Sequence, residues 1–273
     1  MNRVPAATLL PLVLLLAGAA VESMRLPALV LLLAGLVASL VHRRRGPEEG
    51  TSRAVLVWAG CLAVALNMAW TGVPLPAFAR DLACADRFAP FAALRIIGAV
   101  VMLGAVAVLV RIVRADPADL GLRWPSRPWL LTSLAGLPVI AVAAILLGPI
   151  LAKPFFGPVS PMPRDLGSLI PALAFAVANA SMEEVAYRGA LLRWLTPVTG
   201  TATALALQAL VFGLAHGTGT DFTGSPLPVM AATAAAGLIL GAMALRTRSL
   251  LLPIAIHVAL DIPVFYGKVC LGL

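Results

Sequence analysis

Charged residues are scarce in this sequence of 273 residues. Asp, Glu, Lys and Arg make up 12% of it, whereas hydrophobic residues make up 61%. Soluble domains have roughly 25% charged and about 45–50% apolar residues, so a water-soluble protein built around one buried core is excluded. The apolar residues form runs long enough to cross a bilayer. We therefore expect an all-α, polytopic transmembrane helix bundle.

Cysteine is also scarce. Cys61, Cys84 and Cys270 lie far apart, each within or beside an apolar stretch, and no CxxC pair occurs. This spacing excludes a zinc knuckle and does not suggest a disulfide framework. We interpret the three residues as free, buried thiols, which behave as small hydrophobic side chains.

The net charge of +8 does not indicate nucleic acid as a partner. The arginines are distributed over short segments between apolar runs and form no continuous basic patch. Loops on the cytoplasmic side of a membrane protein collect Lys and Arg. Membrane topology therefore explains the charge, and the bilayer is the expected partner.

The apolar runs predict nine helices and about 8–9 membrane spans. The expected ranges are 5–21, 26–42, 54–78, 88–113, 129–151, 167–195, 201–216, 227–245 and 250–270. The first run can alternatively be read as a signal peptide, with Arg3 as its basic n-region. The first two runs are short enough to form a tight hairpin.

The basic residues divide unequally between the two sides of this arrangement. If the loop with Arg43–Arg45 is cytoplasmic, thirteen of the twenty basic residues lie on that side and seven on the other. This bias predicts a cytoplasmic N-terminus and an exterior C-terminus. The thirteen are Arg3, Arg43, Arg44, Arg45, Arg53, Arg111, Arg114, Arg123, Arg127, Arg188, Arg193, Arg246 and Arg248, and the seven are Arg25, Arg80, Arg87, Arg95, Lys153, Arg164 and Lys268. The composition, rich in Ala and Arg, suggests a bacterial plasma membrane.

A segment rich in proline and charge, residues 115–129, interrupts the apolar runs. We interpret it as an interfacial linker with Trp124 and Trp129 at the level of the lipid headgroups. It divides the chain into N-terminal helices with the linker, 1–128, and a C-terminal bundle, 129–273.

Ionisable groups inside an apolar helix are costly and therefore mark functional sites. Glu183 and Glu184 follow an apolar run, and Arg188 comes four residues after Glu184. At that spacing Arg188 can neutralise Glu184, whereas Glu183 points about 100° away around the helix. A carboxylate without such a partner can take a proton from water and return it to a leaving group.

Two further motifs lie in the following apolar runs. His216 comes four residues after Phe212, and His257 and Asp261 lie one helical turn apart. The third histidine of the chain, His42, adjoins the arginine cluster and is interpreted as a solvated helix end. Each motif alone has a purely structural explanation, such as a satisfied histidine or an internal hydrogen bond. Their concentration in successive apolar helices favours one site.

In order, residue type and spacing, these motifs resemble those of the CPBP family of intramembrane proteases. That family includes the type II CAAX prenyl endopeptidases and bacterial relatives linked to bacteriocin immunity. The resemblance covers 167–265. One position departs from the pattern, because the eukaryotic prenyl proteases have Asn where this chain has Asp261. An ionised Asp would repel an oxyanion, so Asp261 is protonated, orients His257, or binds a metal.

The resemblance implies an intramembrane endopeptidase whose substrate is a membrane-embedded or lipid-anchored peptide or protein. We expect Glu183 to activate a water, His216 to position that water, and His257 with Asp261 to stabilise the oxyanion. Glu184, Arg188 and Phe212 are expected to support the site. We expect the active site to face the cytoplasm.

Three different interpretations of the same residues remain open at this point. Glu183, His216, His257 and Asp261 could together bind a zinc ion with an open position for water. What is known of the family favours a mechanism without metal or cofactor, and the HExxH motif of zinc proteases is absent. The chain could also be a non-catalytic membrane scaffold of the same fold. A proton-coupled transporter is the third interpretation, although no internal repeat supports it.

Overall fold

The computed structural model describes residues 6–45, 49–71, 82–156, 166–218 and 225–271, and their regular structure is entirely helical. The helices are α1 (Ala6–Ala20), α2 (Arg25–Arg45), α3 (Glu49–Thr71), α5 (Phe88–Val113), α6 (Arg127–Phe156), α7 (Leu166–Glu184), α8 (Leu192–Thr199), α9 (Thr201–Gly217), α10 (Pro226–Thr247) and α11 (Leu251–Leu271). Short 3-10 turns are η1 (Glu22–Met24), η2 (Cys84–Arg87) and η3 (Pro117–Leu120), and a π-helical segment, η4 (Val185–Leu191), joins α7 to α8.

The all-α prediction is confirmed, and each of the nine predicted helices is present. The predicted residues 5 and 72–78 at helix ends lie outside the described residues. Within the described part, six helical stretches are long and apolar enough to cross a membrane, and two further apolar helices are shorter. The predicted count of eight or nine spans stays a prediction.

The outer surface of the bundle is apolar, as expected for helices that face lipid. Val100, Val139 and Ile239 are each more than 60% exposed, and many other large aliphatic side chains are also exposed. A soluble monomer rarely exposes so much contiguous apolar surface. The exposed apolar side chains and the six candidate spans together make the chain an integral membrane protein.

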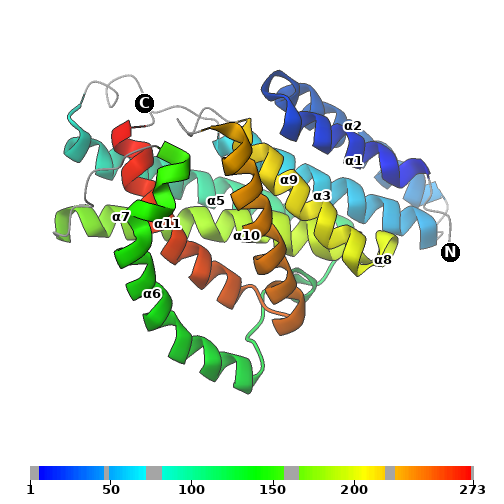
Figure 1. Ribbon diagram of the computed structural model, residues 1–273. Coiled ribbons are helices and arrows are strands. Elements are labelled where there is room, and N and C mark those ends of the chain that lie inside the picture. The colour runs from blue at the N-terminus through cyan, green and yellow to red at the C-terminus, as the bar shows by residue number, and fades with distance from the viewer. Residues whose placement is uncertain (1–5, 46–48, 72–81, 157–165, 219–224, 272–273) are drawn as a thin grey trace.

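The helices pack as one bundle in which α7 occupies a central position (Figure 1). The predicted hairpin is formed by α1 and α2, which lie against α3. Helices α5 and α11 both pack on α7, and α3 packs on η4. Segments from both halves of the chain therefore surround the helix that carries Glu183 and Glu184.

Glycines allow α9 and α10 to approach each other closely. A Cβ atom at Gly213 would lie 2.7 Å from the carbonyl oxygen of Met230 and 2.9 Å from the Cβ of Ala234. On the facing helix, a Cβ atom at Gly237 would lie 3.0 Å from the Cα of Ala209. Small residues at helix contacts are typical of membrane bundles, because backbone packing replaces the hydrophobic effect there. This contact holds the helix of His216.

The predicted linker is a folded segment tied to the turn between α10 and α11. Asp116 caps η3, and Gly121 adopts a φ of 80°, which favours glycine. The amide of Leu250 donates to the carbonyl of Gly121, and the Ser249 hydroxyl donates to the carbonyl of Arg123. The linker thereby fixes the start of α11, the helix of His257.

The expectation of three free thiols is wrong for two of them. Cys84 and Cys270 form a disulfide, with their Cα atoms 5.1 Å apart and a sequence separation of 186. Cys61 is free and buried, as expected. A pairing over such a distance leaves no spacing signature in the sequence, so the apolar surroundings alone suggested buried thiols.

We expect Gly213→Ala to destabilise the bundle, because its new methyl group would collide with backbone atoms of α10. Overpacking of this kind costs about 1–3 kcal/mol. The matched control is Gly104→Ala in α5, where a Cβ atom meets nothing within 4 Å, so the higher helix propensity of alanine should leave stability unchanged or higher. Thermal unfolding in detergent measures both variants. An unfolding temperature for Gly213→Ala equal to that of the control would contradict the close packing of α9 and α10.

Candidate active site

Glu184 and Arg188 form a buried ion pair at the centre of the bundle. Oε1 of Glu184 lies 2.9 Å from Nη1 of Arg188, and both side chains are 0% exposed. The i, i+4 spacing predicted this contact. Arg188 belongs to η4, where the turn is wider than in an α-helix, a distortion that is frequent at functional sites.

The aromatic ring of Phe212 connects the ion pair to the histidines. The guanidinium carbon of Arg188 lies 4.1 Å from the centroid of this ring, within the range of a cation–π contact. The ring also contacts the imidazole of His216 in a tilted arrangement, with centroids 4.3 Å apart, and meets that of His257 edge-on at 6.2 Å. Phe212, which the sequence predicted as a supporting residue, lies between the cation and both imidazoles.

His257 of α11 is oriented by Glu184. The Nδ1 atom of His257 lies 2.8 Å from Oε1 of Glu184 in a buried hydrogen bond. When the carboxylate oxygen accepts this bond, Nδ1 carries the hydrogen. This fixes the ring so that Nε2 faces Glu183 Oε2 at 3.7 Å and Asp261 Oδ1 at 3.6 Å.

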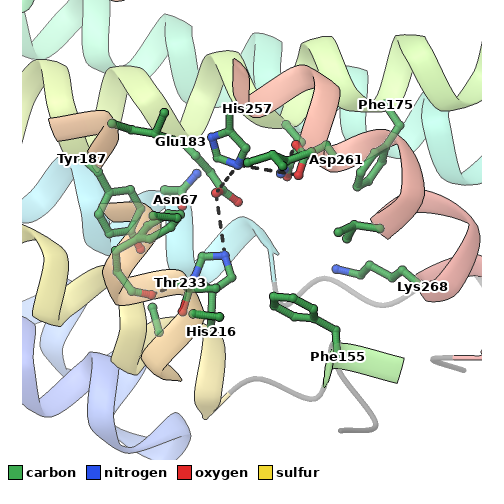
Figure 2. Close-up of a pocket in the computed structure, with 18 of the residues that line it drawn as sticks. Asn67, Phe155, Phe175, Glu183, Tyr187, His216, Thr233, His257, Asp261 and Lys268 are labelled. Carbon is green, nitrogen blue, oxygen red and sulfur yellow. Dashed lines mark hydrogen bonds and ion pairs between the residues drawn. The ribbon is translucent and has the colours of Figure 1, made fainter. Parts of the chain in front are cut away.

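His216, at the end of α9, approaches Glu183 from the opposite side. Its Nδ1 donates to the carbonyl oxygen of Phe212 at 2.7 Å, which directs Nε2 toward Glu183 Oε2 at 3.8 Å. Figure 2 shows the Glu183 carboxylate between the two imidazoles. The site therefore joins side chains from α7, α9 and α11, which the sequence predicted to converge.

Glu183 differs from its neighbour in having no close partner. Its side chain is 6% exposed, and Oε2 has no hydrogen-bond partner among the residues that the structure describes. Both facing nitrogens lie just beyond hydrogen-bonding distance. Glu184 thus has an arginine as its partner, whereas the partners of Glu183 are the two imidazoles, at 3.7 and 3.8 Å.

Asp261 is held by an asparagine that the sequence analysis did not single out. Asn179 Nδ2 donates to Oδ2 of Asp261 at 3.0 Å. Asn179 lies one turn before Glu183 on α7, so an interrupted apolar face was the available signal. The contact between Asp261 and His257 is the longer one, at 3.6 Å.

These residues line a cavity of about 370 Å³ that also receives side chains from the N-terminal half. Asn67 of α3 and Arg95 of α5 both line it. Each is buried, and Asn67 Nδ2 and Arg95 Nη1 have no hydrogen-bond partner within the described ranges. The sequence offered a weak signal for both, namely a polar side chain inside an apolar span. The N-terminal half therefore supplies two unsatisfied donors to the cavity.

Two arginines of the charge count are buried inside the bundle. Arg95 is 7% exposed, with its guanidinium carbon 5.2 Å from the Phe175 ring centroid, and Arg188 is fully buried. Neither reports on loop topology. Removing them leaves twelve basic residues against six, so the direction of the bias is unchanged.

In the described part of the chain, no group of three or more His, Cys, Asp or Glu side chains is arranged to hold a metal ion. The zinc set considered from sequence, Glu183, His216, His257 and Asp261, comes close together without forming such a group.

Comparison with known proteins identifies the segment that carries the site. Residues 165–263 match the family described as type II CAAX prenyl endopeptidase Rce1-like, and this range contains all three motifs. The resemblance to CPBP-family proteases is thereby confirmed for this segment. No curated protein and no solved structure shows a significant match to the chain.

We expect Glu184→Gln to destabilise the protein much more than Glu183→Gln. The first substitution leaves the Arg188 cation buried without a counter-charge, which typically costs about 3–5 kcal/mol, whereas Glu183 has no close partner to lose. Thermal unfolding of both variants measures the difference. The double variant Glu184→Gln/Arg188→Met removes both charges and should recover part of the loss. Equal unfolding temperatures for the two single variants would show that the buried pair is unimportant.

Proposed function

We propose that this chain is an intramembrane endopeptidase that hydrolyses a peptide bond of a membrane-associated protein or peptide, using a water activated by Glu183. The observation that carries the proposal is the unpaired Glu183 carboxylate, enclosed in a cavity and faced by the Nε2 atoms of His216 and His257. The family match over 165–263 supports protease chemistry.

In this mechanism Glu183 takes a proton from a water in the cavity, and the resulting hydroxide attacks the carbonyl carbon of the scissile bond. Glu183 then passes the proton to the leaving nitrogen, so one water is consumed and two peptide ends are released. A positioned base of this kind contributes roughly 10²–10⁴-fold. His216 positions the water, because its Nδ1 is anchored by Phe212 and its Nε2 faces the same carboxylate oxygen.

His257 stabilises the oxyanion when both of its nitrogens carry hydrogen. Nδ1 donates to Glu184, so the second hydrogen on Nε2 points into the cavity and can be donated to the developing negative charge. Asp261 contacts Nε2 at 3.6 Å and is held by Asn179. We assign Asp261 the role of orienting the Nε2 side of the His257 ring, a role that needs no contact with the substrate.

The proposed substrate is a peptide or protein embedded in the membrane or anchored to it by a lipid. The name of the matched family points to prenylated C-terminal peptides, and a prenylated substrate is one member of this class. Aromatic side chains, Phe155 and Phe175, line the cavity beside its polar groups. Such a lining accommodates an apolar segment next to the scissile bond.

The direction of access follows from the lining of the cavity. Arg25 and Lys268 contribute to it, and both belong to the smaller group of basic residues that the charge bias assigns to the exterior. A cytoplasmic arginine-rich end and a cytoplasmic opening are therefore in conflict. We propose that the cavity opens at the end of the bundle opposite Arg43 and Arg44. With those two arginines on the cytoplasmic side, as the charge bias predicts, the opening faces the exterior.

Glu183→Gln should abolish cleavage, because an amide cannot accept the proton of water under these conditions. The measurement compares membrane proteomes from cells with wild-type protein and with the variant, followed by assay of the purified protein on peptides that accumulate. The matched control is Glu22→Gln, a change of the same type at an exposed glutamate of η1. Cleavage by Glu183→Gln at the wild-type rate would leave a scaffold or transporter as the better explanation.

The same assay addresses metal dependence. We propose that activity persists after exhaustive treatment with a chelator and that purified protein contains no stoichiometric zinc. Stoichiometric zinc whose removal abolishes cleavage would overturn the mechanism without metal and favour zinc-dependent hydrolysis by the same residues.

Cysteine labelling tests the direction of access. The native thiol background is low, because Cys84 and Cys270 are bonded and Cys61 is buried. We expect an impermeant maleimide to label Met24→Cys in intact cells and Trp124→Cys only after permeabilisation, since these exposed positions lie at opposite ends of the bundle. Labelling of Met24→Cys only after permeabilisation would support the cytoplasmic opening expected from sequence.

A further inference from the structure

A second cavity lies at the arginine-rich end of the bundle, away from the proposed active site. It is an open cleft of about 1190 Å³ between the ends of α2 and α5, the linker and α8. The charged side chains that line it are Arg43, Arg44, Arg114, Arg123, Arg193 and Asp119. Five cations against one carboxylate give the cleft a strongly positive lining.

Neutral groups, and not carboxylates, hold several of these arginines in place. Arg43 donates to the carbonyl oxygens of Ile112 and Val113, both at 3.2 Å. Nε of Arg123 donates to the carbonyl of Arg248, and Nη2 of Arg193 to that of Ala244, each at 2.8 Å. Carbonyl oxygens fix the position of a guanidinium without cancelling its charge. Among the residues that the structure describes, Asp119 is the one carboxylate in the lining, so the cleft carries an excess of positive charge.

A buried donor in the same cleft lacks an acceptor. Trp194 lines the cleft and is 3% exposed, and its Nε1 has no hydrogen-bond partner among the described residues. Nε of the neighbouring Arg193 is unsatisfied in the same way. Buried indole N–H groups usually find a partner. The two donors together call for an acceptor supplied by a ligand.

Most of the other lining residues are apolar, which favours a lipid over a free anion. Leu40, Leu56, Ile112 and Leu245 line the cleft beside the arginines. The helices α2 and α5 are candidate membrane spans that end here, so the cleft lies at the level of the headgroups, and exposed side chains such as Val41 and Val108 continue the apolar surface along them. Basic pockets between transmembrane helices bind anionic headgroups.

We propose that this cleft is a binding site for an anionic phospholipid, with the phosphodiester held by Arg123, Arg193 and Trp194 and the acyl chains leaving along α2 and α5. A bound lipid would connect α2, α5 and the linker to α8, which directly follows η4. This proposal does not depend on protease activity.

Native mass spectrometry of the full-length protein with defined lipids tests the site. Wild-type protein should retain phosphatidylglycerol in preference to phosphatidylcholine of the same acyl chains. Each arginine near the membrane surface contributes about fivefold, so Arg123→Gln/Arg193→Gln should bind phosphatidylglycerol about 25-fold more weakly. The control is Arg111→Gln, which removes one charge from an exposed position on α5 outside the cleft and should weaken binding far less than the double variant does.

Thermal unfolding supplies a second measurement. Added phosphatidylglycerol should raise the unfolding temperature of the wild type and of Arg111→Gln but not of the double variant, and inorganic phosphate should have no such effect. Equal retention by all three proteins, or equal retention of both lipids by the wild type, would overturn the proposal. Stabilisation by inorganic phosphate alone would replace the lipid with a free anion and would likewise refute it.

Discussion

One carboxylate oxygen organises the centre of this bundle. Oε1 of Glu184 contacts the Arg188 guanidinium at 2.9 Å and accepts a hydrogen bond from His257 at 2.8 Å. Charges removed from water are costly unless paired, so η4 and α11 must keep this relative position. The orientation of His257, and with it the geometry around Glu183, depends on that contact.

The two adjacent glutamates thereby acquire different environments from a single step along one helix. Glu184 lies inside a network with a cation and an imidazole, whereas Glu183 faces the cavity without a close partner. Phe212 serves both, since its ring covers Arg188 and its carbonyl anchors His216. A hydrolytic site inside a membrane requires residues that are held in fixed positions and a carboxylate that can react with water. Glu184 meets the first requirement and Glu183 the second.

Local geometry explains which features the sequence could predict. Apolar runs located the helices, and the i, i+4 spacing predicted the contact of Glu184 with Arg188, because both depend on residues close in the chain. The hydrogen bond from His257 to Glu184 spans 73 residues, and the Cys84–Cys270 disulfide spans 186. Helical periodicity says which face a residue occupies but not which helix meets that face. For the same reason the contributions of Asn67 and Arg95 to the cavity were not anticipated.

The π-helical turn of η4 has a consequence for any comparison with relatives. A wider turn takes up about one more residue than an α-helical turn, so side chains beyond Leu191 are rotated by about 100° from the positions that an uninterrupted α-helix would give them. Trp194 lines the cleft at the arginine-rich end. A single helical wheel drawn from residue 167 would place this side chain on a different face of the helix. Wheels for this stretch should be drawn as two separate diagrams, with a new phase after the turn.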